Sequence, residues 1–173
     1  MNLVSHRLLL RAIEFDDAEL LMELINDGEV ERMICGWSFP VSYDEQKKWI
    51  ASLSRTKDVL RYIIDDRIDN KSIGTIIVSD IDFKNGTSEI HIKLRENAKC
   101  KGYGTESIKM VTDYLFRELR LNCVCAYVIS SNHASQKLFE NCGFAQEGVL
   151  RSRVYKNGEF QDVLSYSVLN DMK

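Results

Sequence analysis

Proline is almost absent from this sequence, and no Gly/Ser-rich or Pro-rich stretch interrupts it. Pro40 is the single proline among 173 residues. Without a linker, a low-complexity tract or an evident repeat, nothing in the chain marks a boundary between two domains. The length and a hydrophobic content of 45% suit one globular domain with an apolar core. We therefore expect residues 1–173 to form a single domain.

The sequence also lacks long apolar runs, a surplus of basic charge and paired cysteine motifs. No apolar segment approaches the roughly 20 residues that cross a bilayer, and residues 1–11 have no signal-peptide layout, so we expect a cytoplasmic protein without a membrane partner. The formal net charge of -3 argues against a nucleic-acid partner. The five cysteines lack CxxC spacing, which predicts reduced thiols and no metal site.

The hydrophobic patterns predict an α/β fold. Strands are expected at residues 8–13, 59–64, 73–81, 88–94, 123–129, 149–155 and 160–169. Helices are expected after a cap at Asp16 or Asp17 and stopping before Gly28, after Ser42, and over residues 104–119 and 134–141. The order β-α-α-β-β-β-α-β-α-β-β favours a mixed sheet with helices on its faces.

Local signals support several of these boundaries. Ser42 and Glu45 have the spacing of a capping box, which would start the second helix. Asp69-Asn70 and Asn85-Gly86 separate the three central strands, which we expect to form an antiparallel meander. Asn157-Gly158 favours the positive φ angles of a tight hairpin turn between the last two strands.

Residues 99–105 form a glycine-containing loop between a predicted strand and a predicted helix. Gly102 and Gly104 would let the backbone approach an anion at the helix N-terminus, and Lys99 and Lys101 add positive charge. The loop chemistry fits an anion site and an ordinary tight turn equally well. A P-loop lacks support because no Gly-Lys-Ser/Thr follows, and the antiparallel meander disfavours a dinucleotide-binding βαβ unit.

Two motifs resemble those of the GCN5-related N-acetyltransferase (GNAT) family. Residues 99–104 resemble its acetyl-CoA loop, Arg/Gln-x-x-Gly-x-Gly/Ala, with Lys99 in the first position. Asn132-x-x-Ser135-x-x-x-Phe139-x-x-x-Gly143-Phe144 follows at the family's distance. The ending, residues 154–162, resembles the RimJ/RimL-like ribosomal-protein and spermidine acetyltransferase branch, and also amino-sugar-nucleotide acetyltransferases.

The resemblance implies a fold and an activity. The fold would be a mixed, mostly antiparallel sheet flanked by helices. The activity would be acetyl-CoA-dependent transfer of an acetyl group to a primary amine, either of a small molecule such as a polyamine or amino sugar or at a protein N-terminus. A homodimer is compatible with exposed β edges. A non-catalytic CoA-binding or drug-binding module of the same fold is the alternative.

The resemblance also assigns residues to acetyl-CoA. Backbone groups near Leu94 would bond the pantetheine arm, and a free N–H there would stabilise the oxyanion. The strand after the glycine helix would diverge to admit the acetyl arm. The cofactor-binding residues implied are Ile92, Lys93, Leu94, Lys99, Cys100, Lys101, Gly102, Tyr103, Gly104, Thr105, Asn132, Ser135 and Phe139.

Glu89 is the preferred catalytic base, because it lies on the strand where the family often has a carboxylate. His91 shares its predicted face and is the second candidate. Asn132 would place its amide against the cofactor arm or cap the short helix. Many family members have a tyrosine in place of Phe139 that protonates the CoA thiolate, which phenylalanine cannot do.

In the family, the region between the first strand, residues 8–13, and the second, residues 59–64, shapes the acceptor site. It points to Trp37 as a substrate-binding residue, together with Glu89 and Tyr155. Arg151, Arg153 and Tyr155 are expected to alternate along one face of a strand, where they would bind an anionic acceptor. The identity of the acceptor amine is left open by the sequence.

Overall fold

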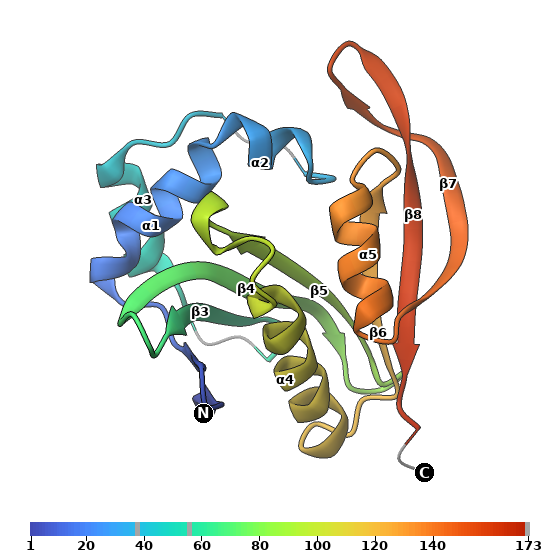
Figure 1. The fold of residues 1–173 in the computed structure, drawn as a ribbon, viewed down its shortest axis with the longest axis horizontal. Helices are drawn as coiled ribbons and strands as arrows, with labels where there is room; N and C mark the ends of the chain where they lie inside the picture. Colours follow the sequence, from blue (N-terminus) through green and yellow to red (C-terminus); the bar gives the residue numbers. More distant parts are fainter. Residues whose placement is uncertain (37–38, 55–56, 172–173) are drawn as a thin grey trace.

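The computed structural model describes residues 1–36, 39–54 and 57–171. Over these residues the chain forms an eight-stranded sheet in the order β1-β2-β3-β4-β5-β6-β8-β7, flanked by helices (Figure 1). The strands are β1 (Leu3–Val4), β2 (Leu8–Arg11), β3 (Leu60–Asp66), β4 (Lys71–Asp82), β5 (Thr87–Leu94), β6 (Cys123–Ile129), β7 (Ala145–Lys156) and β8 (Glu159–Leu169). The helices are α1 (Ala18–Asn26), α2 (Gly28–Arg32), α3 (Tyr43–Ser52), α4 (Tyr103–Arg117) and α5 (His133–Asn141), with 3-10 helices η1 (Phe15–Asp17) and η2 (Glu96–Ala98).

The predicted α/β class and mostly antiparallel sheet are confirmed, and the structure adds a short strand, a short α-helix and two 3-10 helices to the predicted order. β1 pairs antiparallel with β2, and α2 follows α1 directly. The first predicted helix was expected to stop before Gly28, and α1 does end at Asn26, but Gly28 begins a further helix, α2. The carboxylate of Asp27 accepts hydrogen bonds from the N–H groups of Glu29 and Val30, so it caps a new helix there.

Several local predictions hold in detail. Ser42 and Glu45 form both bonds of a capping box at the start of α3. Asn157 and Gly158 have φ angles of 53° and 85° in the turn between β7 and β8. This hairpin projects beyond the rest of the sheet (Figure 1). No helix in the described ranges is long and apolar enough to span a membrane.

The helices cover opposite faces of the sheet. Ile64 of β3 belongs to a buried cluster with Ile108 of α4, and α5 contributes to the same cluster. The neighbouring Ile63 belongs to a second cluster, with Leu20 of α1 and Ile50 of α3. Because consecutive residues of a strand point to opposite faces, α4 and α5 lie on one face and α1 and α3 on the other.

β5 and β6 are parallel and separate part-way along their length. Their register consists of Thr87↔Cys123, Ser88↔Val124 and Glu89↔Cys125. Beyond Glu89, β5 remains paired with β4 as far as Leu94, and β6 remains paired with β8 as far as Ile129. The backbone groups of residues 90–94 that point toward β6 therefore have no ladder partner there, and the strands diverge as the family resemblance implied.

Candidate active site

The glycine loop leads directly into the first turn of α4. Gly102 is the residue before the helix and has a φ of 81°, and Cys100 has a φ of 58°. Within the described residues no side chain caps this end of α4. The N–H groups of the first turn are therefore available to an anion, because they have no intrahelical partner either.

Gly104 has a different role from Gly102. It lies inside α4 and is buried, and a Cβ built on it would stand 3.2 Å from Cδ1 of Leu138 in α5 and 3.5 Å from Cδ1 of Leu94 in β5. The sequence suggested that a glycine is needed here to leave room for a phosphate or to allow an unusual backbone angle. Its backbone is helical, so the structure gives close packing of α4 against α5 and β5 as the reason.

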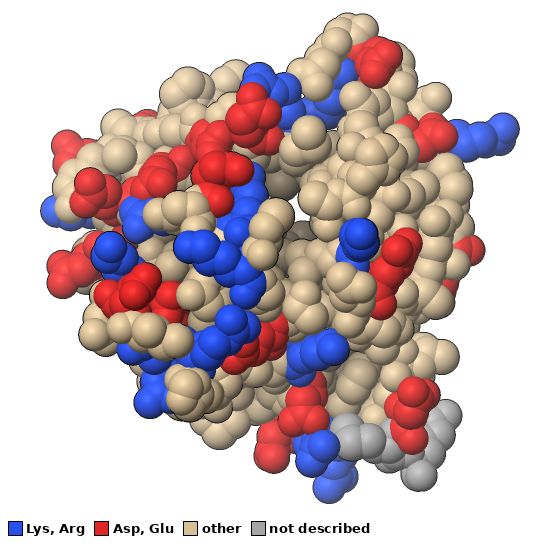
Figure 2. All heavy atoms as spheres, viewed as in Figure 1, with Lys and Arg blue, Asp and Glu red and all other residues tan. Residues whose placement is uncertain are grey.

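The cationic residues of the loop are accessible. Lys99 forms an exposed ion pair with Glu96, and Lys101 and Cys100 are exposed. In Figure 2, basic side chains gather over the segment that leads into α4, and a hollow lies beside them, toward α5. This surface suits a phosphorylated ligand whose arm enters the molecule.

Glu89 and His91 lie together on the face of β5 that points away from α4. Thr75 stands between Ile63 and Lys93 in the register of β3, β4 and β5, so Lys93 shares the face of Ile63. Glu89 and His91 lie four and two residues before Lys93, so they point to that same face, while the buried residue between them points to the other. Oε1 of Glu89 is 3.4 Å from Nε2 of His91, and the two side chains are 23% and 46% exposed. The predicted common face of Glu89 and His91 is confirmed.

A bulge in β4 adds two polar residues to this pair. The register of β4 with β5 shifts between Ser79 and Asp82, and Asp80 has a φ of 51°. Oγ of Ser79 donates to Oδ2 of Asp80 at 3.1 Å and lies 3.0 Å from Nε2 of His91. With its hydrogen committed to Asp80, Ser79 accepts from His91, which puts the proton of the neutral imidazole on Nε2.

The surroundings of Glu89 raise its pKa toward the value that suits a general base near neutral pH. Burial, and then the negative charge of Asp80, raise the pKa of Glu89 to about 6. Desolvation lowers the pKa of His91, with Asp80 acting against this shift and Lys93 adding to it. At neutral pH, Glu89 is therefore a carboxylate and His91 is neutral.

Cys125 of β6 faces Glu89 at the last pair before the strands separate. Burial is the first cause that raises the pKa of this thiol to about 12, and Cys123, Glu147 and Glu89 act in the same direction. Sγ of Cys123 is 3.7 Å from Sγ of Cys125. Both side chains are thiols, and the pKa of Cys125 keeps it protonated at neutral pH, so it is a poor nucleophile.

The second motif places its residues in two different environments. Asn132 caps α5 through the Ser135 N–H at 3.0 Å, and its Nδ2 donates to the Met33 carbonyl at 2.9 Å. Phe139 is buried, with its ring edge-to-face on Phe144 at 5.1 Å between centroids. Phe139 is thus a core residue, so its side chain presents no functional group to a cofactor arm.

The segment after α2 is bonded to strands β7 and β6. Lys156 of β7 is buried, and its Nζ binds the carboxylate of Glu31 and donates to the carbonyls of Glu31 and Gly36 at 2.9 and 2.7 Å. Sγ of Cys35 donates to the Tyr127 carbonyl at 3.6 Å. Burial, and secondarily Glu89, raise the pKa of Cys35, so this segment lies close to the predicted base.

The remaining predicted acceptor residues are less central. Trp37 lies outside the described residues. Tyr155 is 62% exposed and packs against Phe160 on the β7–β8 hairpin, with ring centroids 5.1 Å apart. Its place on the projecting hairpin gives no contact with Glu89.

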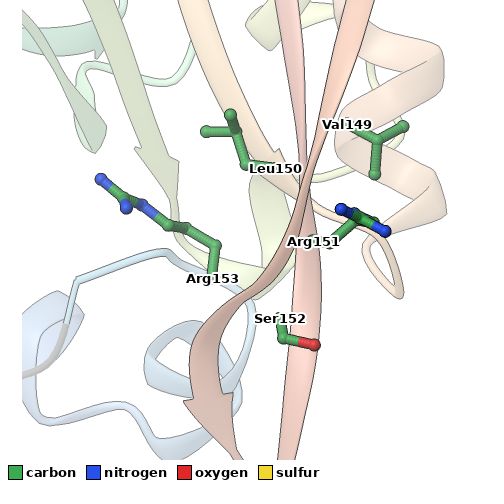
Figure 3. Close-up of a pocket in the computed structure, with 5 residues that line it drawn as sticks. All are labelled: Val149, Leu150, Arg151, Ser152 and Arg153. Carbon is green, nitrogen blue, oxygen red and sulfur yellow. The ribbon is translucent and has the colours of Figure 1, made fainter.

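The prediction that Arg151 and Arg153 share one face of β7 is wrong. The register of β7 with β8 breaks between Leu150 and Val154, and Ser152 has a φ of 47° with its N–H bonded to Asp162. Arg151 and Arg153 consequently point to opposite sides of β7 (Figure 3). A shallow cavity of about 550 Å³ lies at this bulge, lined by Val149, Leu150, Arg151, Ser152 and Arg153. It contains no group suited to proton transfer from an amine.

The sequence did not indicate Ser79, Asp80 or Lys156 as residues near the site. Asp80 reaches it because of a bulge, and Lys156 pairs with a residue 125 positions away. A local motif identifies neither. The one signal available for Asp80 was its place in the run Ser79-Asp80-Ile81-Asp82, which interrupts an otherwise apolar strand.

The site combines a glycine turn at a helix N-terminus with a parallel strand pair that opens at a carboxylate. This arrangement suits a transferase whose co-substrate carries both phosphates and an amide-containing arm. Residues 7–145 match the family model of the acetyltransferase (GNAT) domain. The chain belongs to this family; it is an N-acetyltransferase, and acetyl-CoA is its co-substrate.

Individual relatives are similar over nearly their full length. A SPbeta prophage-derived uncharacterized N-acetyltransferase of Bacillus subtilis is 32% identical over 167 residues, which cover 96% of this chain and 92% of that protein. The spermidine N(1)-acetyltransferase of Vibrio cholerae is 27% identical, with coverages of 96% and 95%. The crystal structure of spermidine N-acetyltransferase from Vibrio cholerae in complex with CoA and spermine has a TM-score of 0.88 and 25% identity, covering 96% of this chain and 97% of that one.

Proposed function

We propose that this enzyme acetylates a primary amine of a small molecule by direct attack in a ternary complex, with Glu89 as the general base. One observation carries the proposal. Glu89 lies at the last paired position before β5 and β6 separate, and its pKa is raised to about 6. A carboxylate there stands where an arm lying between the strands would end, and its protonation equilibrium suits proton transfer near neutral pH.

The residues present fit acetyl-CoA. The first-turn N–H groups of α4, next to the positive φ of Gly102, suit the pyrophosphate, and the exposed Lys99 and Lys101 add charge. The open edge of β5, from Ile92 to Leu94, has the backbone groups that pantetheine amides require. We assign Cys100, Tyr103, Thr105, Asn132 and Ser135 to the surroundings of the same cofactor.

Bound acetyl-CoA would supply the acetyl group as an activated thioester. The chain's own residues then have three tasks. Glu89 accepts the proton that the acceptor amine loses as its nitrogen bonds to the acetyl carbon, and the carbon–sulfur bond breaks with CoA leaving as the thiolate. A free N–H on the open edge of β5 close to Glu89 stabilises the oxyanion, because the N–H groups near Leu94 lie about 16 Å further along the strand, toward the pyrophosphate site. His91 donates its Nε2 proton toward Ser79 and the Glu89 carboxylate, which orients the base.

A small-molecule amine is the acceptor class that the comparisons favour, since both the sequence match and the structural match in Vibrio cholerae are named for spermidine. The acidic groups near the site, Glu89 and Asp80, agree with a cationic acceptor. Amino sugars and protein N-termini are the other acceptors that the same chemistry would serve. A turnover screen with acetyl-CoA across polyamines, amino sugars, aminoglycosides and N-terminal peptides identifies the class.

The assignment of the base is tested with the best acceptor from that screen. Glu89→Gln should lower kcat by about 10²–10⁴-fold, the usual contribution of a general base, and leave the Kd of acetyl-CoA nearly unchanged. His91→Ala is the matched control on the same face and should lower kcat less. If Glu89→Gln keeps the wild-type rate and pH profile but His91→Ala loses them, His91 is the base.

A further inference from the structure

The turn between β1 and β2 contacts the cofactor loop, although the two lie far apart in the sequence. Arg7 belongs to this turn, and its Nη1 donates to the Lys101 carbonyl at 3.2 Å. Its Nε donates to Oε2 of Glu106 in the first turn of α4 at 2.9 Å, and Nη2 reaches the same oxygen at 2.5 Å. One guanidinium therefore bonds the backbone before Gly102 and a side chain after it.

Neighbouring contacts give the guanidinium a defined orientation. Its Cζ lies 5.0 Å from the centre of the Tyr103 ring, and Oγ of Ser5 donates to the second oxygen of Glu106 at 2.5 Å. The Tyr103 hydroxyl donates in turn to Asp66, which is buried at the end of β3. The side chain of Arg7 is 36% exposed, so its contacts are partly shielded from water.

Arg7 also occupies the space beside the glycine whose backbone conformation matters. A Cβ on Gly102 would stand 3.5 Å from Nη2 of Arg7. Gly102 has a left-handed conformation, and the bond from Arg7 to the Lys101 carbonyl fixes the peptide unit that precedes it. A planar guanidinium can make these bonds together, but a lysine ammonium offers no such fork.

We infer that Arg7 is a positioning residue for the acetyl-CoA loop, holding residues 101–106 in the phosphate-binding conformation before the cofactor arrives. The inference rests on the proposed site at this loop. A pre-ordered loop binds more tightly because its ordering entropy is not lost on binding. Loss of Arg7 should therefore weaken binding of acetyl-CoA and leave the acetyl-transfer step intact, since no contact of Arg7 reaches Glu89 among the described residues.

The test is the affinity for CoA, measured by calorimetry, together with kcat and the KM for acetyl-CoA. Arg7→Ala should raise both Kd and KM by about tenfold, the size expected for lost charge-assisted hydrogen bonds, with kcat within about twofold of wild type. Glu106→Gln should change Kd in the same direction. The double variant should be little worse than Arg7→Ala, because both changes break the same interaction.

Arg67→Ala is the matched control. The Arg67 side chain donates to the Ser5 carbonyl in the same turn, and within the described part of the chain no hydrogen bond or ion pair joins it to the loop. Its variant should keep the wild-type Kd. An unchanged Kd in Arg7→Ala, or an equal loss in Arg67→Ala, would overturn the inference. If Arg7→Ala does not fold, Arg7→Lys serves instead, because it keeps the charge and loses the fork.

A Gly102→Val variant separates this inference from the proposed site. If Gly102→Val binds CoA as well as wild type does, the cofactor does not lie at this loop, and the site assignment is wrong. If Gly102→Val loses affinity but Arg7→Ala and Arg7→Lys do not, the site stands and the role of Arg7 is refuted.

Discussion

At the scale of single residues, the chemistry depends on a carboxylate beside another carboxylate. Asp80 has a φ of 51°, which a non-glycine residue adopts at a cost of about 1–2 kcal/mol. Its negative charge is the second cause, after burial, of the raised pKa of Glu89. The strained conformation therefore occurs in the residue whose charge raises the pKa of the proposed base.

Asp80→Asn should consequently lower the pKa of Glu89 from about 6 toward the ordinary value for glutamate. The sign follows from the charge: a nearby anion disfavours the charged carboxylate, so removing the anion favours it. NMR titration of ¹³C-labelled Glu89 in the free protein measures the shift. Asp82→Asn, in the same strand, is the control and should leave the titration unchanged. A Glu89 midpoint that stays near 6 in Asp80→Asn would show that burial alone sets this pKa.

At the scale of elements, the glycine helix is held closely against its neighbours. Gly104→Val would place a branched side chain against Leu138 and Leu94, forcing α4 away from α5 and β5. We expect a loss of about 1–3 kcal/mol in the free energy of unfolding and a greatly weakened affinity for CoA, because the first turn of α4 moves.

Denaturant unfolding and calorimetry measure the two effects of Gly104→Val. Gly148→Ala is a suitable control, since no atom lies within 4 Å of a Cβ built at Gly148. A folded Gly104→Val protein with unchanged CoA affinity would contradict the assignment of the cofactor to this helix.

Local signals predicted most element boundaries, because caps and turns depend on neighbouring residues. Ser42 with Glu45, and Asn157 with Gly158, act over a few positions, and both were predicted. The sequence did not predict α2, since Gly28 is typical of a helix end and the cap by Asp27 is equally local but less distinctive. The close approach of Glu89 and His91 followed from strand alternation.

The long-range contacts could not be predicted from the sequence, for a physical reason. Arg7 meets Glu106 across 99 positions, and Lys156 meets Glu31 across 125. Such contacts depend on the order of strands in the sheet and on their register. Neither the order nor the bulge at Asp80 is encoded by a local pattern.

At the scale of the whole molecule, the sheet consists of two parts with a short connection between them. β1 to β5 form one continuous ladder, and β6 to β8 form the other, joined through three residue pairs of β5 and β6. Other contacts bridge the two parts: Lys156 binds the segment after α2, and Asn132 donates to Met33. The opening between the parts is thus closed at one end by pairing and bordered by side-chain contacts.

The separation of β5 from β6 gives a central strand the hydrogen-exchange behaviour of an edge strand. The amides of residues 90–94 that point toward β6 have no ladder partner there, whereas their neighbours bonded to β4 do. We expect alternating fast and slow amide exchange along this part of β5 in the free protein, read by NMR. Saturating CoA should slow the fast amides selectively, because the cofactor arm would take the place of the missing strand. Uniform slow exchange before CoA is added would mean that the opening is closed in the free protein.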